Sequence, residues 1–242
     1  MRFTFLITAF FCVSFASGQT IQADSLNYVN ALKNAKTLYR QFVDPPTGLY
    51  NGGEYVEYAY QIKEGDPFFA PDFKTGSVLY DGILYNNVPL LYDIFKESVV
   101  IKDPFEIYKL VLINERLSEF TIQDHRFIKL IGNDSNRSVI STGYYEVLYD
   151  GAIHVYRQEK KKMQENVTFT EGIKRYIVET NFYFIEKDNT LYPVNKKKSL
   201  LSALVNKKSE VQQFMRKNKL NLRKDKIGTL TKVAAYYDEI NK

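Results

Sequence analysis

The chain has few of the residues that form covalent cross-links, metal sites and nucleophilic centres. Its 242 residues include one cysteine, two histidines and no tryptophan. Cys12 lies within the first 18 residues, which we expect to be removed, so the mature chain would have no disulfide and no thiol nucleophile. A three-histidine zinc site is excluded by counting, and no calcium-loop pattern is present. We predict no metal site and no cofactor.

Recognisable catalytic motifs are also missing. The sequence has no Gly-x-Ser-x-Gly segment, no glycine-rich phosphate loop and no dinucleotide fingerprint. His154 alternates with apolar residues and His125 lies in a polar segment, and we expect structural roles for both. The carboxylates near predicted strand ends are only weak candidates for a glycosidase pair; they are Asp81, Asp93, Glu146 and Asp150. We predict no catalytic residues and a protein that is not an enzyme.

Long hydrophobic runs are confined to the N-terminus. Arg2 precedes the apolar run Phe3–Phe15, and Ala16-Ser17-Gly18 supplies small residues before a cut at Gln19. This pattern predicts a cleavable secretory signal over residues 1–18. No other apolar segment reaches the length that crosses a bilayer. We expect an exported protein, cleaved near Gly18-Gln19, with no transmembrane segment in the mature chain.

Charge is unevenly distributed. Residues 196–242 contain thirteen basic and four acidic residues, whereas residues 19–195 carry a net charge of −5. The basic tail could dock on an anionic surface, or it could be the solvated face of helices. Export and the acidic body argue against nucleic acid as a partner.

Two copies of one short string organise the middle of the chain. The string Val-Leu-Tyr-Asp-Gly begins at Val78 and again at Val147. Asp-Gly between alternating apolar segments is typical of a hairpin with a type I′ turn, because that turn needs positive φ at both central residues. We therefore predict hairpins at Tyr80-Asp81-Gly82-Ile83 and at Tyr149-Asp150-Gly151-Ala152.

Short apolar segments at intervals of about ten residues predict a mainly β protein with antiparallel pairing. The fold class we predict is α+β, mainly β: a barrel, a two-sheet sandwich or one strongly curved sheet. Lys160–Lys162 is expected to lie in an exposed connection. The expected strands are Glu54–Ile62, Ser77–Tyr80, Ile83–Tyr85, Val88–Tyr92, Ser98–Ile101, Ile107–Ile113, Leu117–Ile122, Phe127–Ile131, Gly143–Tyr149, Ala152–Arg157, Arg175–Ile185 and Leu191–Val194.

Helices are expected at the two ends. Apolar residues recur at three- and four-residue spacing over Asp24–Val43, which Pro45-Pro46 terminates. The same spacing after Val194 predicts two or three short amphipathic helices that dock on the β domain. We predict a signal peptide over residues 1–18, a helix plus β domain over residues 19–195, and a basic helical tail over residues 196–242.

Aromatic residues supply the candidate binding sites. The chain contains nineteen tyrosines; many cluster on the predicted strands, and sheet packing explains most of them. A more specific interpretation is a cavity for an apolar ligand, lined by Tyr80, Tyr85, Tyr92, Tyr149 and Tyr156. Phe68, Phe69 and Phe73 lie between prolines, in a loop that either covers the core or exposes a surface for a partner.

Several segments together resemble a bacterial family. They are Gly48-Leu49-Tyr50-Asn51-Gly52, Glu54-Tyr55, Gly65-Asp66-Pro67-Phe68-Phe69, Tyr80-Asp81-Gly82, Val88-Pro89-Leu90-Leu91-Tyr92-Asp93 and Lys217-Asn218-Lys219-Leu220-Asn221. In this order they resemble uncharacterised secreted proteins of Bacteroidetes-type bacteria. The resemblance implies a periplasmic or surface location and implies no reaction.

Three functions follow as hypotheses. The first is a non-enzymatic interaction or structural module of the cell envelope, which uses the Pro67–Phe73 loop or the basic tail to contact a partner that the sequence does not identify. The second is a carrier of an apolar small ligand or lipid in a β cavity. The third is a hydrolase, which would need a cleft that brings His125 or His154 next to a carboxylate.

Overall fold

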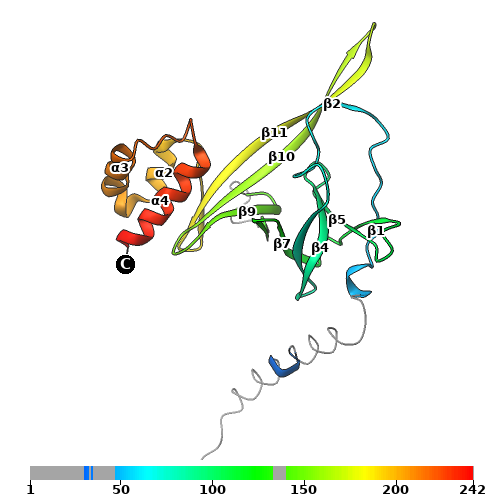
Figure 1. Ribbon diagram of the computed structural model, residues 1–242. Helices are drawn as coiled ribbons and strands as arrows, with labels where there is room; N and C mark the ends of the chain where they lie inside the picture. The colour runs from blue at the N-terminus through cyan, green and yellow to red at the C-terminus, as the bar shows by residue number, and fades with distance from the viewer. Residues whose placement is uncertain (1–29, 33, 35–46, 133–139, 242) are drawn as a thin grey trace, which may run out of the picture. The chain divides into compact units, whose positions relative to one another are not determined.

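The computed structural model describes residues 30–32, 34, 47–132 and 140–241 (Figure 1). The chain divides into two units, residues 1–46 and residues 47–242, and the named elements belong to the second unit. The predicted signal over residues 1–18 lies outside the described residues. Of the helix predicted over Asp24–Val43, only four residues are described; they are helical, and the predicted helix is not confirmed.

The second unit consists of β-strands followed by helices. The strands are β1 (Gly53–Glu54), β2 (Ile62–Glu64), β3 (Lys74–Tyr80), β4 (Ile83–Asp93), β5 (Ser98–Lys102), β6 (Lys109–Val111), β7 (Leu117–Ile122), β8 (His125–Leu130), β9 (Gly143–Asp150), β10 (His154–Thr168), β11 (Gly172–Lys187) and β12 (Thr190–Pro193). The helices are α2 (Lys197–Ala203), α3 (Lys208–Lys217) and α4 (Lys226–Ile240), with short 3₁₀ turns at Thr47–Leu49 and Val205–Lys207. The mainly β class and the C-terminal helices are confirmed.

The strands form one twelve-stranded sheet in the order β1-β6-β5-β4-β3-β7-β8-β9-β10-β11-β12, with β2 beside β11. Each pair is antiparallel except β2–β11, which is parallel. Among the described residues the end strands β1 and β12 do not pair with each other, so the barrel we considered is wrong. The single sheet also excludes the two-sheet sandwich, and an open sheet remains.

The first predicted hairpin forms as expected. β3 and β4 pair directly, and the turn residues Asp81 and Gly82 have φ values of 51° and 73°. These values are those of a type I′ turn, whose twist matches the flanking strands.

The second predicted hairpin joins β9 and β10, but its turn differs from the prediction. The connection is Gly151–Ile153, a register shift interrupts the pairing, and neither Asp150 nor Gly151 has positive φ. The reason lies in α4: the Asp238 carboxylate accepts hydrogen bonds from the Ala152 amide at 2.8 Å and from the Tyr149 hydroxyl at 2.9 Å. This contact determines the turn geometry.

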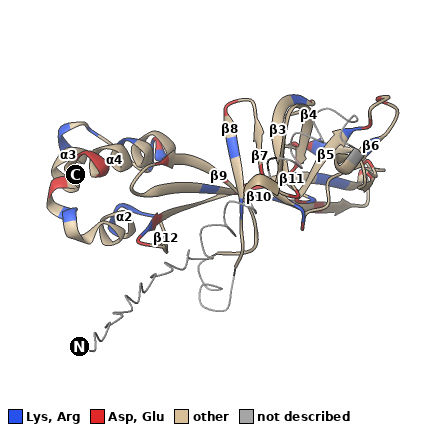
Figure 2. Cartoon of the chain, turned by 90° about the horizontal axis from the view of Figure 1, so that it is seen from below, with Lys and Arg blue, Asp and Glu red and all other residues tan. Residues whose placement is uncertain are grey.

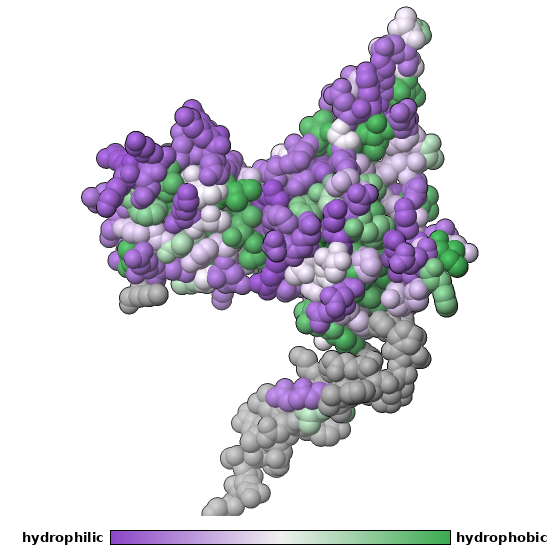
Figure 3. All heavy atoms as spheres, viewed as in Figure 1, coloured by the Kyte–Doolittle hydropathy of each residue, from purple (hydrophilic) through white to green (hydrophobic). Residues whose placement is uncertain are grey.

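Two predictions about individual segments were wrong. Glu54–Ile62 is not one strand, because Tyr55 and Tyr58 both donate hydrogen bonds to the buried carboxylate of Asp93. That arrangement places residues three apart on the same side, which a strand with a period of two does not allow. Lys160–Lys162 is not a connection but lies within β10, which forms a fifteen-residue ladder with β11. The far part of this hairpin is mostly hydrophilic (Figure 3), so it lacks the alternation that marks a half-buried strand.

Two main clusters of buried side chains stabilise the unit. One lies among strands β3 to β9 and includes Val78, Phe120 and Tyr144. The other joins the helices to β10 and β11, and includes Ile153, Leu230 and Tyr237. Short amphipathic helices are marginal alone, so α2, α3 and α4 depend on this packing. No helix in the described part of the chain combines the length and the apolar composition needed to cross a membrane.

Candidate functional site

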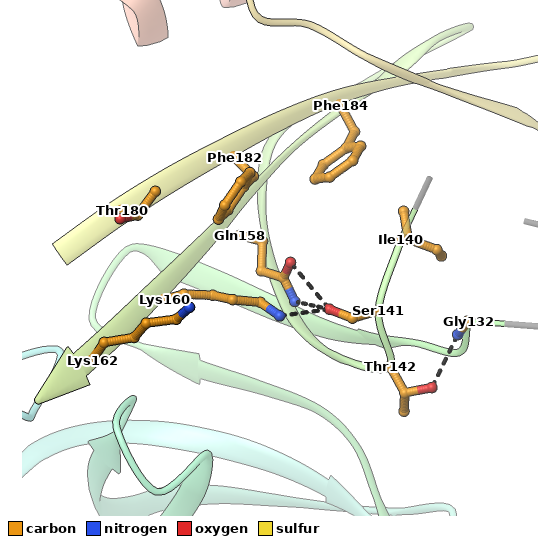
Figure 4. Close-up of a pocket in the computed structure, with 10 residues that line it drawn as sticks. All are labelled: Gly132, Ile140, Ser141, Thr142, Gln158, Lys160, Lys162, Thr180, Phe182 and Phe184. Carbon is orange, nitrogen blue, oxygen red and sulfur yellow. Dashed lines mark hydrogen bonds between the residues drawn. The ribbon is translucent and has the colours of Figure 1, made fainter. Parts of the chain in front are cut away.

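A pocket of about 700 Å³ lies against the β10–β11 hairpin (Figure 4). Its apolar side chains are Ile140, Phe182 and Phe184. Phe184 and Ile140 are buried, but Phe182 is 39% exposed. An aromatic side chain that is partly open to solvent beside buried apolar groups gives the pocket an exposed apolar surface. We call this cavity the Phe182 pocket.

The register of the hairpin places these side chains together. Gln158 lies opposite Phe182, and Lys160 lies opposite Thr180. Residues two apart on a strand share a face, so Gln158, Lys160 and Lys162 of β10 line the same side as Thr180, Phe182 and Phe184 of β11. The opposite wall is the segment Ile140–Thr142 that leads into β9.

The polar rim of the pocket is basic. The Lys160 ammonium donates a 2.8 Å hydrogen bond to Ser141 Oγ, and the buried Gln158 amide donates one of 3.1 Å to the same oxygen (Figure 4). Within the described residues, neither Lys160 nor Lys162 forms an ion pair with a carboxylate. The pocket thus presents two cationic groups that lack an acidic partner, beside an apolar floor.

The five predicted ligand-binding tyrosines are not brought to one cavity. Tyr80 and Tyr92 are buried in the cluster among β3–β9, where Tyr85 packs at the margin. Tyr149 packs against the cluster beneath the helices, and Tyr156 belongs to a third cluster with Phe184. Their hydroxyls have separate partners, such as Glu186 for Tyr156 at 2.7 Å and Asn51 for Tyr80 at 3.2 Å. Their role in binding a ligand stays a prediction.

The three predicted partner-binding phenylalanines are half-buried. The Phe69 ring packs edge-on against His125 and Phe127, at centroid distances of 4.9 and 5.0 Å. Phe68 and Phe73 pack against a small cluster that contains Tyr55 and Leu91, and they line a shallow pocket of about 310 Å³. The loop therefore covers the sheet and leaves part of each ring open; contact of these residues with a partner stays a prediction.

Beside that loop lies a buried carboxylate that is fully hydrogen-bonded. Asp93 accepts 2.7 Å hydrogen bonds from the hydroxyls of Tyr55 and Tyr58, and the Lys96 amide donates a third at 2.9 Å. The Lys96 ammonium lies over both tyrosine rings, at 4.5 and 4.2 Å from their centroids. Burial, and then the bond to Asp93, raise the pKa of Tyr55 and of Tyr58 above its ordinary value. These groups fix a loop, and none is left free for chemistry.

Each histidine lies next to a carboxylate, as the hydrolase hypothesis requires. His125 Nδ1 is 2.5 Å from Glu146 Oε1, and His154 Nδ1 is 2.8 Å from Asp150 Oδ1. Glu146 also lies 2.6 Å from Arg157 Nε, although these two atoms are not aligned as a hydrogen bond. In the part of the chain that the structure describes, neither imidazole is hydrogen-bonded to a hydroxyl. Both pairs are polar contacts between neighbouring strands, and the described residues place no hydroxyl nucleophile beside either imidazole.

The basic tail surrounds a second pocket of about 650 Å³. Figure 2 shows basic and acidic residues along the C-terminal helices, and the pocket is lined by Lys196, Lys197, Lys198, Arg223 and Lys226 among others. One of these side chains is already engaged, because the Lys226 ammonium lies 4.9 Å from the centroid of the Tyr183 ring. The described residues contain no group of three or more His, Cys, Asp or Glu side chains that could hold a metal.

The Phe182 pocket was missed from the sequence, because Lys160 and Lys162 were expected in a connection. The local polarity pattern gave no signal, because Gln158, Lys160 and Lys162 are flanked by further charged residues. Comparison with protein-family models, curated proteins and solved structures finds no match for the chain. A proposal for the function therefore rests on the geometry of the site and on the sequence.

Proposed function

We propose that the protein is an exported, non-enzymatic interaction module of the cell envelope, and that it binds a protein partner at the Phe182 pocket. The observation that carries this proposal is the combination of a 39% exposed Phe182 with two lysines that have no acidic partner among the described residues. A partly exposed aromatic ring in a concave site is the kind of anchor at which interface energy concentrates. The export signal that the sequence predicts for the first 18 residues supports the proposed location.

The same pocket disfavours the carrier hypothesis. Its lining combines apolar side chains with two lysines and a buried amide, Gln158, so an apolar ligand would leave charged and polar groups desolvated without partners. The hydrolase hypothesis is disfavoured because His125 and His154 pair with carboxylates and with no hydroxyl among the described residues.

Photo-crosslinking in the producing cell tests the proposal. The photoreactive residue p-benzoylphenylalanine replaces Phe182 in one variant and Leu84 in a control, since Leu84 is a 59% exposed apolar residue on β4. We expect a discrete crosslinked protein at Phe182 and none at Leu84. The same product at both positions, or none at Phe182, would contradict the proposal. A product at Phe73 alone would move the contact to the Pro67–Phe73 loop.

A further inference from the structure

The outer edge of β11 is occupied at its two ends and vacant between them. β10 pairs with β11 along its whole length. On the other side, β2 pairs with Arg175 and Tyr176, and β12 pairs with residues 184–187. Among the described residues, no strand pairs with the outer edge over the residues between, 177–183. The position next to β11 is therefore a gap within the sheet.

The register identifies which backbone groups face this gap. The Val194 amide donates a 2.8 Å hydrogen bond to the Tyr183 carbonyl, so the main chain of Tyr183 points away from β10. Main-chain direction alternates along a strand, so Glu179 and Asn181 also direct their N–H and C=O groups outward. Unpaired groups of this kind on a strand edge form a template for another strand.

The gap has a definite length. Six residue steps of about 3.3 Å separate Ile177 from Tyr183, which gives about 20 Å. Gly65, next to β2, closes one end, since a Cβ at this glycine would lie 2.5 Å from the Ile177 carbonyl oxygen. Val194 closes the other end. The sixteen-residue β11 of a second copy could not enter without displacing β2 or β12, whereas a short extended segment fits.

A side chain at the gap is also incompletely bonded. The Asn181 side chain donates a 2.5 Å hydrogen bond to Glu179, but its carbonyl oxygen is buried with no hydrogen-bond partner in the described structure. A buried acceptor without a donor is costly, and a strand laid along this edge could bring one.

The opposite edge of the hairpin differs. Beyond Arg157, β10 has no strand partner on its β9 side among the described residues, but the side chains of Glu159 and Lys161 are largely buried there. The Lys161 ammonium donates a 2.6 Å hydrogen bond to the Phe68 carbonyl, so the Pro67–Phe73 loop contacts β10 along this part of the strand. The edge of β11 is the one that is bounded at both ends and lies beside the Phe182 pocket.

We propose that an extended peptide segment of a partner protein inserts as a strand into this gap, and that apolar and acidic side chains two residues apart, on one face of that strand, are directed at the Phe182 pocket. The inference rests on the proposed interaction function and specifies its partner. Side chains on one face of the added strand lie beside Thr180 and Phe182, where an apolar group meets the phenylalanine and a carboxylate two residues along reaches Lys162.

Selection from a displayed library of random peptides of about nine residues provides the probe. We expect selected peptides to carry apolar and acidic residues two positions apart, on one face of the strand, and to bind the purified full chain. Methylating the peptide amides that face β11 abolishes binding, whereas methylating those on the other edge does not. On binding, the Glu179 and Asn181 amides become at least about tenfold slower in hydrogen exchange.

Matched variants separate backbone pairing from side-chain contact. Glu179→Pro removes the outward N–H without removing a ladder bond to β10, and Glu179→Ala removes the side chain alone. We expect about tenfold weaker binding for the proline variant and little change for the alanine variant. Lys162→Glu weakens binding of acidic peptides, whereas Lys217→Glu, the same charge change on α3, does not.

Failure to select any binding peptide, unprotected amides, or equal binding by the two Glu179 variants would each overturn strand insertion. A crosslink at Phe182 that persists alongside such a result would leave the interaction module standing. Loss of that crosslink would remove the proposed function itself.

Discussion

The two copies of Val-Leu-Tyr-Asp-Gly need their glycines for different reasons. Gly82 has a φ of 73° and nothing lies within 4 Å of where its Cβ would be. Gly151 has no positive φ, but its Cβ would lie 2.0 Å from Asp238 Oδ2 and 2.7 Å from the Tyr149 ring. The first glycine serves the backbone conformation, and the second serves the close approach of α4.

The free-energy cost of replacing each glycine by alanine should therefore respond differently to a change in α4. Gly82→Ala is expected to lower the free energy of unfolding by about 1–2 kcal/mol, the cost of a left-handed L-residue. Gly151→Ala is expected to cost about 1–3 kcal/mol through overpacking. Measured by urea unfolding, Asp238→Ala should reduce the cost of Gly151→Ala and leave that of Gly82→Ala unchanged. Additive effects in both pairs would contradict the contact.

The sequence predicted both hairpins from their Asp-Gly pairs. At Gly82 this signal is local, because the turn depends on the backbone conformation of the glycine itself. It could not predict the second turn, since Asp238 lies far along the chain and reaches Gly151 only after α4 docks. The same limit applies to Glu54–Ile62, whose alternation indicated a strand with Tyr55 and Tyr58 on opposite faces. Their hydroxyls bond to Asp93, and this distant buried carboxylate overrides the local pattern.

At the scale of elements, the C-terminal helices show a pattern that local reasoning detects well. The spacing of Leu230, Val233, Ala234 and Tyr237 predicted a helix with one apolar face, and these residues are buried in α4. The β10–β11 hairpin is the opposite case, because Lys, Glu and Gln have low strand propensity. Its ladder of fifteen pairs depends on the partner strand, which a local window does not include.

Packing of α4 on the sheet can be measured by one substitution. Leu230 is completely buried against the cluster that contains Ile153 and Val155. We expect Leu230→Ala to lower the free energy of unfolding by about 2–5 kcal/mol, because it leaves a cavity between helix and sheet. Val205→Ala, at a position 68% exposed, should change it by no more than about 0.5 kcal/mol. Equal effects in chemical unfolding would show that α4 does not stabilise the sheet.

At the scale of the whole molecule, the buried tyrosines make stability depend on alkaline pH. Burial raises the pKa of Tyr92 well above its ordinary value, and burial with the bond to Asp93 raises those of Tyr55 and Tyr58. In the unfolded chain these phenols ionise near pH 10. Because the folded pKa is higher, their contribution is fully present below about pH 10 and is lost as the pH rises further.

The unfolding midpoint in urea, followed from about pH 8 to about pH 11.5, checks this dependence. We expect the midpoint to fall above about pH 10, and to fall less steeply in Tyr92→Phe, which removes one buried phenol. The difference between the two proteins isolates Tyr92 from the lysines that titrate in the same range. Parallel curves for both would show that Tyr92 ionises as easily in the folded state.

At this scale the sequence predicted the fold class, which is mainly β with helices at the C-terminus. Strand order could not, because pairs such as β3–β7 and β2–β11 join segments far apart in sequence. The candidate site depends on that order, since the gap beside β11 exists only where β2 and β12 stop. No residue within the gap has a sequence feature that predicts an unpaired strand edge.

The pairing of β2 with β11 has a consequence for the order of folding. Ile62 and Arg175 are partners although about 110 residues separate them, whereas most other strand pairs are close neighbours along the chain. Such a contact closes a long loop, so the conformational entropy of that loop is lost before the pairing contributes any stabilisation. The hairpins can form before β2 pairs with β11, so the last segment to join the sheet would come from near the start of the second unit. Until it does, the edge of β11 is open beyond the gap, and a newly made chain is most exposed there to pairing with the wrong strand.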